Sequence, residues 1–306
     1  MFFQQDFHSQ IWKKSKAVYI NKNRNFYQNS NHVKKRGFIM KMGITVYGAH
    51  LMVPEEGRTV AKIIRQAANV GFDGIDLGYY WGEDKASEFA EAKKVADGEG
   101  IQIANYIVGN NFGNAAAEDR LDAEIEKVKT ALKEAAYFNC GTLRVFGGGY
   151  GLDWKTYSPR IAEALAACVE TAKENNVVMA LEDHGALCKN SSEQLFYINE
   201  VNSPYLRATA DIGNFWLPGG ELPIVGVSSV AEYVAMVHVK DYVFVNNTPV
   251  ACPVGEGVID FKSCFRALKD VNFDGWLSLE YECSIGVPKQ GITTSLVNMR
   301  RFAATC

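Results

Sequence analysis

The chain has 306 residues, of which 47% are hydrophobic and 22% are charged. This composition is ordinary for a globular protein and allows a large core, so it excludes a disordered chain, a fibre and a small disulfide scaffold. No apolar run reaches the roughly 18 residues that a membrane span needs, and we therefore expect no membrane partner. The seven cysteines are scattered and form no C-x-x-C pair, which indicates a reducing, cytoplasmic location and no zinc ribbon.

Charge is distributed unevenly along the chain. Residues 1–41 contain nine Lys and Arg and a single acid, Asp6, whereas residues 42–306 contain 23 basic and 34 acidic side chains. The first segment lacks the apolar stretch of a secretory signal. We expect it to be a leader that is disordered or not part of the domain, with Met40 or Met42 as the working start. The acidic remainder argues against a nucleic-acid partner.

From residue 42 onward, short apolar runs alternate with longer helical patterns, which is typical of parallel β/α proteins. The expected strands are residues 43–49, 74–77, 101–108, 142–146, 177–183, 206–212, 236–241 and 275–282. The expected helices are residues 58–70, 84–99, 116–138, 155–175, 191–201, 227–233, 261–270 and 289–303. Eight such pairs predict a single (β/α)8 TIM barrel over residues 42–306. A doubly wound sheet is the alternative, but residues 47–51 read YGAHL where that fold has G-x-G-x-x-G.

Polar side chains gather at the ends of four consecutive predicted strands. Alternate residues of a strand point to opposite faces, so the apolar positions that face the helices leave the intervening polar ones facing inward. In a TIM barrel the C-terminal ends of the strands carry the catalytic groups. The side chains aimed there are Glu182, His184, Asp211, His238, Lys240 and Glu280.

Three of these side chains are carboxylates that would repel one another when buried unless a cation neutralised them. Glu182, Asp211 and Glu280, together with the imidazole of His238, form a mixed oxygen and nitrogen set. Such a set suits a divalent ion, of which Mn²⁺ is our expectation and Mg²⁺, Co²⁺ and Zn²⁺ are alternatives. A salt-bridge network without metal is the other interpretation.

The motifs around these residues resemble the sugar phosphate isomerase/epimerase superfamily, the xylose-isomerase-like TIM barrels, over nearly all of residues 42–306. The matching segments are ALEDHG at 180–185, DIGN at 211–214, VHVKD at 237–241, VGEG at 254–257 and LSLE at 277–280. The resemblance implies that Glu182, Asp211, His238 and Glu280 bind one divalent metal. It also implies proton transfer through a metal-stabilised enediolate, with Glu182 and Glu280 as the base and the acid.

Two departures from the ketose epimerases of that superfamily concern the substrate. Those enzymes carry His three residues after the aspartate ligand, where this chain has Asn214, and an Asn-Arg pair after the first Glu, where this chain reads His184-Gly185-Ala186. His184 either supplies the missing imidazole as a catalytic acid or base, or is a hydrogen-bonded histidine next to the metal ligands without a catalytic role. The substrate-binding candidates are Lys240, Arg144, Trp216 and Asn214, and the alternatives are structural salt bridges for the first two and rim packing for Trp216.

The sequence thus predicts a metal-dependent isomerase or epimerase of a sugar, keto-sugar or cyclitol, with a homo-oligomer left open. The main alternative is a dehydratase or other lyase that acts on 3-keto-glycosides or inososes on the same scaffold. An endonuclease would need more histidines than His50, His184 and His238. A catalytically silent binding subunit is the last alternative.

Overall fold

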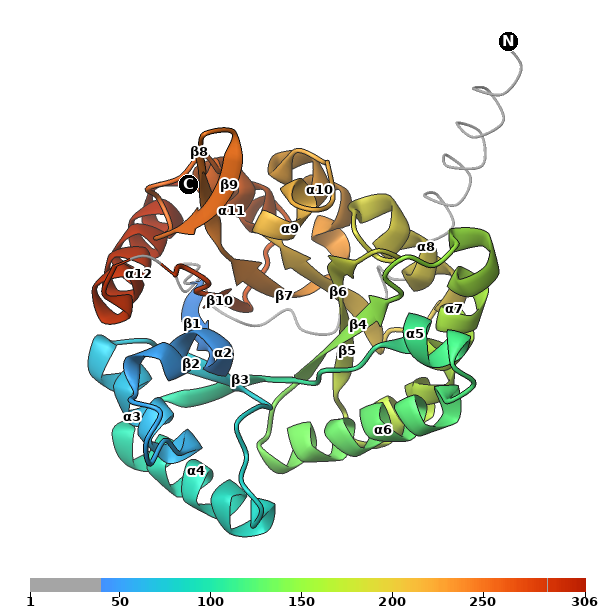
Figure 1. Ribbon diagram of the computed structural model, residues 1–306, viewed down its shortest axis with the longest axis horizontal. Coiled ribbons are helices and arrows are strands. Elements are labelled where there is room, and N and C mark those ends of the chain that lie inside the picture. Colours follow the sequence, from blue (N-terminus) through green and yellow to red (C-terminus); the bar gives the residue numbers. More distant parts are fainter. Residues whose placement is uncertain (1–39, 285) are drawn as a thin grey trace, which may run out of the picture. The chain divides into compact units, whose positions relative to one another are not determined.

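Eight parallel strands close into one barrel in the computed structural model, which describes residues 40–284 and 286–306 (Figure 1). Around the barrel the strands follow the order β1-β10-β7-β6-β5-β4-β3-β2. Their bounds are β1 Lys41–Thr45, β2 Gly74–Leu77, β3 Gln102–Ile107, β4 Thr142–Gly148, β5 Val178–Gly185, β6 Leu206–Asp211, β7 Val234–Val239 and β10 Trp276–Leu279. The predicted single TIM barrel is confirmed. Apart from Met40 and Lys41, the predicted leader lies outside the described residues.

The longer helices form the outer ring of the barrel (Figure 1). The longer ones are α3 Val60–Val70, α4 Lys85–Glu99, α6 Leu121–Tyr137, α7 Trp154–Glu174, α8 Ser191–Val201, α10 Pro223–Val230, α11 Phe261–Asp270 and α12 Pro288–Thr305. The shorter ones are α2 Val46–Ala49, η2 His50–Met52, α5 Phe112–Ala117, α9 Ile212–Trp216 and η3 Ala231–Tyr233. Within the described residues, none of them combines the length and hydrophobicity that crossing a bilayer requires.

Local sequence sets the bounds of these helices, as α3 illustrates. Thr59 caps its first turn by accepting a hydrogen bond from the backbone N–H of Lys62, and Gly71 ends it in the left-handed conformation. Between them, Val60, Ile63, Ile64 and Ala67 recur at helical spacing and are buried. This apolar face packs toward the barrel.

Two predicted elements differ from the structure. Residues 46–49, expected to extend the first strand, form α2, because the Thr45 side chain accepts from the backbone N–H of Gly48 and starts a helix there. Residues 116–138, expected as one helix, contain the end of α5 and all of α6. The chain breaks between them at Asp119, whose φ of 55° is incompatible with a continuous α-helix.

The sequence analysis missed an antiparallel hairpin, β8 Asp241–Val245 and β9 Thr248–Cys252. Its two-residue turn consists of Asn246 and Asn247, which have φ values of 51° and 63°. Positive φ at both turn residues is the type I′ geometry that matches the twist of a hairpin. The hairpin follows β7 after Lys240 and therefore stands at the C-terminal end of the barrel.

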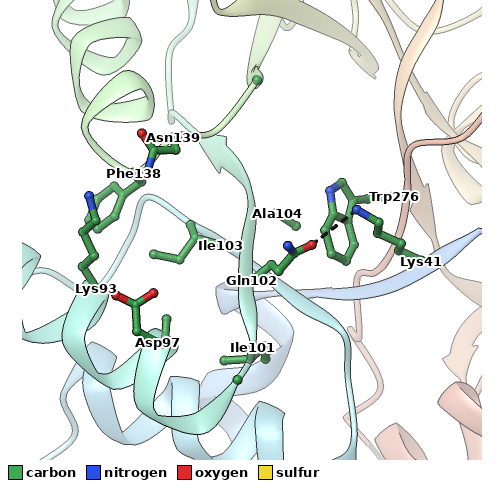
Figure 2. Close-up of a pocket in the computed structure, with 13 residues that line it drawn as sticks. Lys41, Lys93, Asp97, Ile101, Gln102, Ile103, Ala104, Phe138, Asn139 and Trp276 are labelled. Carbon is green, nitrogen blue, oxygen red and sulfur yellow. Dashed lines mark hydrogen bonds between the residues drawn. The ribbon is translucent and has the colours of Figure 1, made fainter.

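Packing of large side chains marks the opposite, N-terminal end of the barrel. Trp276 lies against Gly74, where an added Cβ would come within 2.6 Å of the indole, so this close approach requires glycine. The Lys41 ammonium lies 4.8 Å from the centre of the Trp276 ring and donates a 3.3 Å hydrogen bond to the side-chain oxygen of Gln102. Figure 2 shows these side chains lining a hollow at the strand starts.

Candidate metal and sugar site

Four buried side chains converge at the C-terminal ends of adjacent strands. Glu182 comes from β5, Asp211 ends β6, His238 lies on β7 and Glu280 directly follows β10. One ligand atom of each lies within 4.8 Å of the corresponding atoms of the other three. The register pairs Asp211 with His238 on the neighbouring strand. The structure thus brings together the four side chains that the sequence assigns to a metal.

The ring of His238 is oriented so that one nitrogen faces the carboxylates. Its Nδ1 lies 2.6 Å from Glu182 Oε1, 3.8 Å from Asp211 Oδ2 and 3.7 Å from Glu280 Oε2. Its Nε2 points elsewhere, 3.8 Å from Asp76 Oδ2. Burial disfavours the imidazolium, but the charges of Glu280 and Glu182 outweigh it and raise the pKa of His238 to about 10. Nδ1 is therefore the ligand atom that this geometry offers to a cation.

Two buried cations complete the site. Lys240 Nζ lies 2.5 Å from Glu280 Oε2, 3.1 Å from Asp211 Oδ2 and 3.3 Å from Glu282 Oε1. Arg144 Nη1 lies 3.4 Å from Glu182 Oε2 and 4.0 Å from Glu280 Oε1. These cations and His238 supply positive charge that offsets the buried carboxylates.

The cations leave the carboxyl groups in different states. Burial disfavours ionisation of Glu182, but Arg144 and His238 outweigh it, and the pKa of Glu182 lies below its ordinary value. Lys240 and His238 likewise overcome burial at Glu280 and lower its pKa. At Asp211, burial dominates over the charge of Lys240 and raises the pKa to about 7. The two glutamates are thus carboxylates at neutral pH.

The donor set fits a divalent cation. Ligands on opposite sides of an ion with bonds of about 2.1 Å lie about 4.2 Å apart, which agrees with a cluster whose ligand atoms lie within 4.8 Å of one another. Asp211 Oδ2 is buried and accepts no aligned hydrogen bond, although the Lys240 ammonium is 3.1 Å away. Three carboxylates are hard donors and one imidazole is a borderline donor, which is the kind of ligand set that divalent ions such as Mn²⁺ and Co²⁺ bind.

His184 lies on an aromatic wall beside the four ligands. Its ring centre is 4.4 Å from that of Phe146, and its Nδ1 is 3.4 Å from the Tyr150 hydroxyl. Phe146 also packs on the Arg144 guanidinium at 4.0 Å. Burial lowers the pKa of His184, so its imidazole is neutral at pH 7 and can either accept or donate a proton.

The two remaining substrate-binding candidates differ in their surroundings. Asn214 donates its backbone N–H to Asp211 Oδ1, and its buried side-chain Nδ2 has no hydrogen-bond partner in the described part of the chain. An unpaired buried donor of this kind is costly unless a ligand uses it. Trp216 is half-buried, and its ring packs edge-on against Phe244 of the hairpin at 5.3 Å.

Sequence reasoning missed Asp76 and did not foresee the role of Tyr79. Asp76 is fully buried on β2, and the hydroxyl of Tyr79 accepts a 2.9 Å hydrogen bond from Arg144 Nη2. A signal for Asp76 was present, because Ile75 and Leu77 on either side are apolar and the strand alternation directs Asp76 inward.

Comparisons with known proteins identify the family of this chain. The xylose isomerase-like TIM barrel family matches residues 64–301, and the chain belongs to that family. L-ribulose-5-phosphate 3-epimerase UlaE of Escherichia coli strain SMS-3-5 is 34% identical over 230 residues, which cover 69% of this chain and 78% of the relative.

Two solved structures share the fold. L-ribulose 3-epimerase superposes with a TM-score of 0.73 at 17% identity and covers 87% of this chain and 95% of its own. 3-keto-D-glucoside 4-epimerase YcjR from E. coli gives 0.71 at 18% identity and covers 86% of this chain and 100% of its own.

Proposed function

We propose that this protein is a sugar epimerase that depends on a divalent metal, Mn²⁺ foremost, and acts on a ketose or keto-sugar. One observation carries the proposal: four buried donors, Glu182, Asp211, His238 and Glu280, lie within mutual reach of one cation at the end of the barrel where catalytic groups gather. The epimerase names of the 34% identical relatives support the class of reaction. Their substrate, L-ribulose 5-phosphate, is the first candidate for this chain.

A cation held by these ligands would supply Lewis acidity toward the oxygens of a hydroxy-ketone and would so acidify the carbon-bound proton beside the carbonyl. Glu182 and Glu280 then move that proton. They come from β5 and from the end of β10, which are separated by two strands around the barrel, so they flank the centre from two sides. One glutamate, as a carboxylate, removes the proton, and the other, carrying a proton taken from solvent, delivers it to the opposite face of the same carbon.

The surrounding residues bind and orient the sugar. Arg144 keeps Glu182 ionised and in place, held in turn by Tyr79. Lys240 would donate from its ammonium to a substrate oxygen if a bound cation took over its contacts with Asp211 and Glu280. The unpaired Asn214 Nδ2 is a second donor, and Trp216 forms part of the rim. The neutral imidazole of His184 relays a proton to or from a substrate hydroxyl.

The test is proton NMR in heavy water of sugars incubated with the Mn²⁺-loaded protein and freed of metal before recording. The panel contains L-ribulose 5-phosphate, L-ribulose, 3-keto-glucosides and inososes. Deuterium entering a carbon beside the carbonyl, with formation of the epimer, is the expected result and identifies the carbon. Exchange accompanied by loss of water or of an aglycone would instead establish the lyase, and no exchange across the panel would overturn the enzymatic proposal.

Ligand variants test the site itself. Four substitutions are expected to abolish exchange and to lower the bound metal per chain: Glu182→Gln, Asp211→Asn, His238→Ala and Glu280→Gln. Each removes one donor from a buried cluster, whereas the fold depends on the whole barrel. Full metal content and turnover in any two of them would remove the quartet as the catalytic centre.

A further inference from the structure

Asp76 and His238 face each other inside the barrel with unpaired atoms. Asp76 is fully buried on β2, and His238 is fully buried on β7. Asp76 Oδ2 and His238 Nε2 have no hydrogen-bond partner in the described residues, and they lie 3.8 Å apart. An unpaired carboxylate oxygen in a protein interior is costly, so a pair of such atoms that face each other calls for an explanation.

A chain of hydrogen bonds from the neighbouring strands holds the Asp76 carboxylate in this orientation. Asn105 on β3, also buried, donates from Nδ2 to Asp76 Oδ1 at 2.7 Å. Thr142 at the start of β4 donates from its hydroxyl to Asn105 Oδ1. With Oδ1 held by Asn105, Asp76 keeps Oδ2 directed at His238.

The chemistry of the two groups determines which imidazole nitrogen carries hydrogen. A carboxylate only accepts hydrogen bonds, so the nitrogen facing Asp76 must be the donor, which places hydrogen on His238 Nε2. In the neutral ring the lone pair then resides on Nδ1. Nδ1 is the nitrogen that faces Glu182, Asp211 and Glu280, at 2.6 to 3.8 Å.

We propose that Asp76 is a positioning residue for the metal centre: it holds His238 in the Nε2-protonated form and so presents the Nδ1 lone pair to the cation. Asn105 and Thr142 keep the Asp76 carboxylate aimed. The inference rests on the proposed function, because it assumes that His238 is a metal ligand. Outer partners of this kind fix the orientation of ligating histidines and raise their basicity.

The main test replaces Asp76 by Asn, which keeps the shape, removes the charge and offers an amide that can donate. Mn²⁺ titrations followed by electron paramagnetic resonance should show a dissociation constant about 10–100-fold higher in Asp76→Asn than in the wild type. Nitrogen NMR of histidine-labelled protein loaded with diamagnetic Zn²⁺ provides a second readout. In the wild type, His238 should show hydrogen on Nε2 and metal on Nδ1, and in Asp76→Asn that pattern should be lost.

Asp183→Asn is the matched control. Asp183 is an equally buried acid next to Glu182, and its Oδ1 accepts from the backbone N–H of Asp211 at 2.7 Å. Asn keeps an acceptor oxygen at the same position, so Asp183→Asn retains this hydrogen bond. Its Mn²⁺ affinity should stay within about twofold of the wild type, because it does not touch the His238 ring.

Asn105→Ala provides a second route to the same answer, because it leaves the Asp76 charge but frees the carboxylate to rotate. We expect a loss of Mn²⁺ affinity of about 3–10-fold, smaller than for Asp76→Asn. Wild-type affinity and an unchanged His238 tautomer in Asp76→Asn would overturn the inference, as would an unchanged Asn105→Ala if Asp76→Asn does not fold. A wild-type protein that binds no Mn²⁺ would instead refute the metal centre, and the titration of the unmodified chain alone reveals that case.

Discussion

Lys240 is the side chain whose removal best separates the two ways of neutralising the site. Its ammonium contacts Glu280 Oε2 at 2.5 Å and Asp211 Oδ2 at 3.1 Å, and only 4% of the side chain is exposed. Lys240→Met keeps most of the volume and removes the charge. Breaking a buried ion pair by removing one partner costs about 3–5 kcal/mol. Because 1 kcal/mol shifts the Tm of a domain of this size by about 2–4 °C, the metal-free Tm should fall by about 6–20 °C.

Added metal should act in the opposite direction in this variant. In the wild type, a cation must displace the Lys240 ammonium from Asp211 and Glu280, whereas in Lys240→Met those carboxylates are vacant. At a free Mn²⁺ concentration of about 100 times its dissociation constant, binding stabilises by about 2.7 kcal/mol, or about 5–11 °C in Tm. The variant should have the lower dissociation constant, so one fixed Mn²⁺ concentration should raise its Tm by more degrees than that of the wild type, as measured by differential scanning calorimetry with and without EDTA.

Lys129→Met is the control for loss of a lysine as such. Its ammonium pairs with Glu126 at 2.8 Å, but 70% of the Glu126 side chain is exposed. Surface pairs contribute at most about 1 kcal/mol, so the Tm should move by less than about 4 °C. The reasoning would be refuted if Lys240→Met matched this control in metal-free Tm and matched the wild type in its response to Mn²⁺.

Three further predictions concern the pH, a loop and the start of the chain. The pKa of His238 is about 10, so a metal that binds Nδ1 must displace the proton there. Mn²⁺ affinity should therefore rise with pH below 10, and titration calorimetry in two buffers of different ionisation enthalpy should show proton release. Binding without proton release would contradict this prediction. Asp241 accepts four backbone hydrogen bonds, including those of Gly255 and Gly257. Asp241→Ala should therefore cost about 3 kcal/mol or more of unfolding free energy and lower the Tm by more than about 6 °C. An unchanged Tm would show that these hydrogen bonds do not stabilise the loop. Deleting residues 1–39 should leave Tm and Mn²⁺ affinity unchanged, and a large loss in either would show that the segment belongs to the domain.

The barrel and the convergence of its ligands could be predicted because both depend on local patterns. Residues 74–77 read GIDL, in which apolar Ile75 and Leu77 alternate with Gly74 and Asp76, and the structure places β2 at the same bounds. The alternation along β5 determines that Glu182 faces inward, whatever the neighbouring strands do. Once eight such runs are found, closure brings the C-terminal ends together, so distant residues such as Glu182 and His238 become neighbours.

The hairpin β8–β9 escaped prediction although its turn carries a recognisable signal. Asn246 and Asn247 are among the residues that tolerate positive φ at a type I′ turn. The flanking run Tyr242-Val243-Phe244-Val245 shows no alternation of polar and apolar residues, and Pro249 weakens the case for a second strand. The only separation from β7 is Lys240, so the pattern merges with the end of the barrel strand.

Asp76 illustrates a different limit. The alternation along β2 shows that this acid faces inward, but it does not give the residue opposite it, because that depends on how strand tilt and register close the barrel. β2 and β7 do not pair, and β1 and β10 lie between them. Only closure sets Asp76 Oδ2 3.8 Å from His238 Nε2. A pattern within one strand therefore identifies which side chains enter the interior, and the closed barrel determines which of them act on one another. In this protein that distinction separates the metal ligands, which the ends of the strands indicate, from the acid that orients one of them.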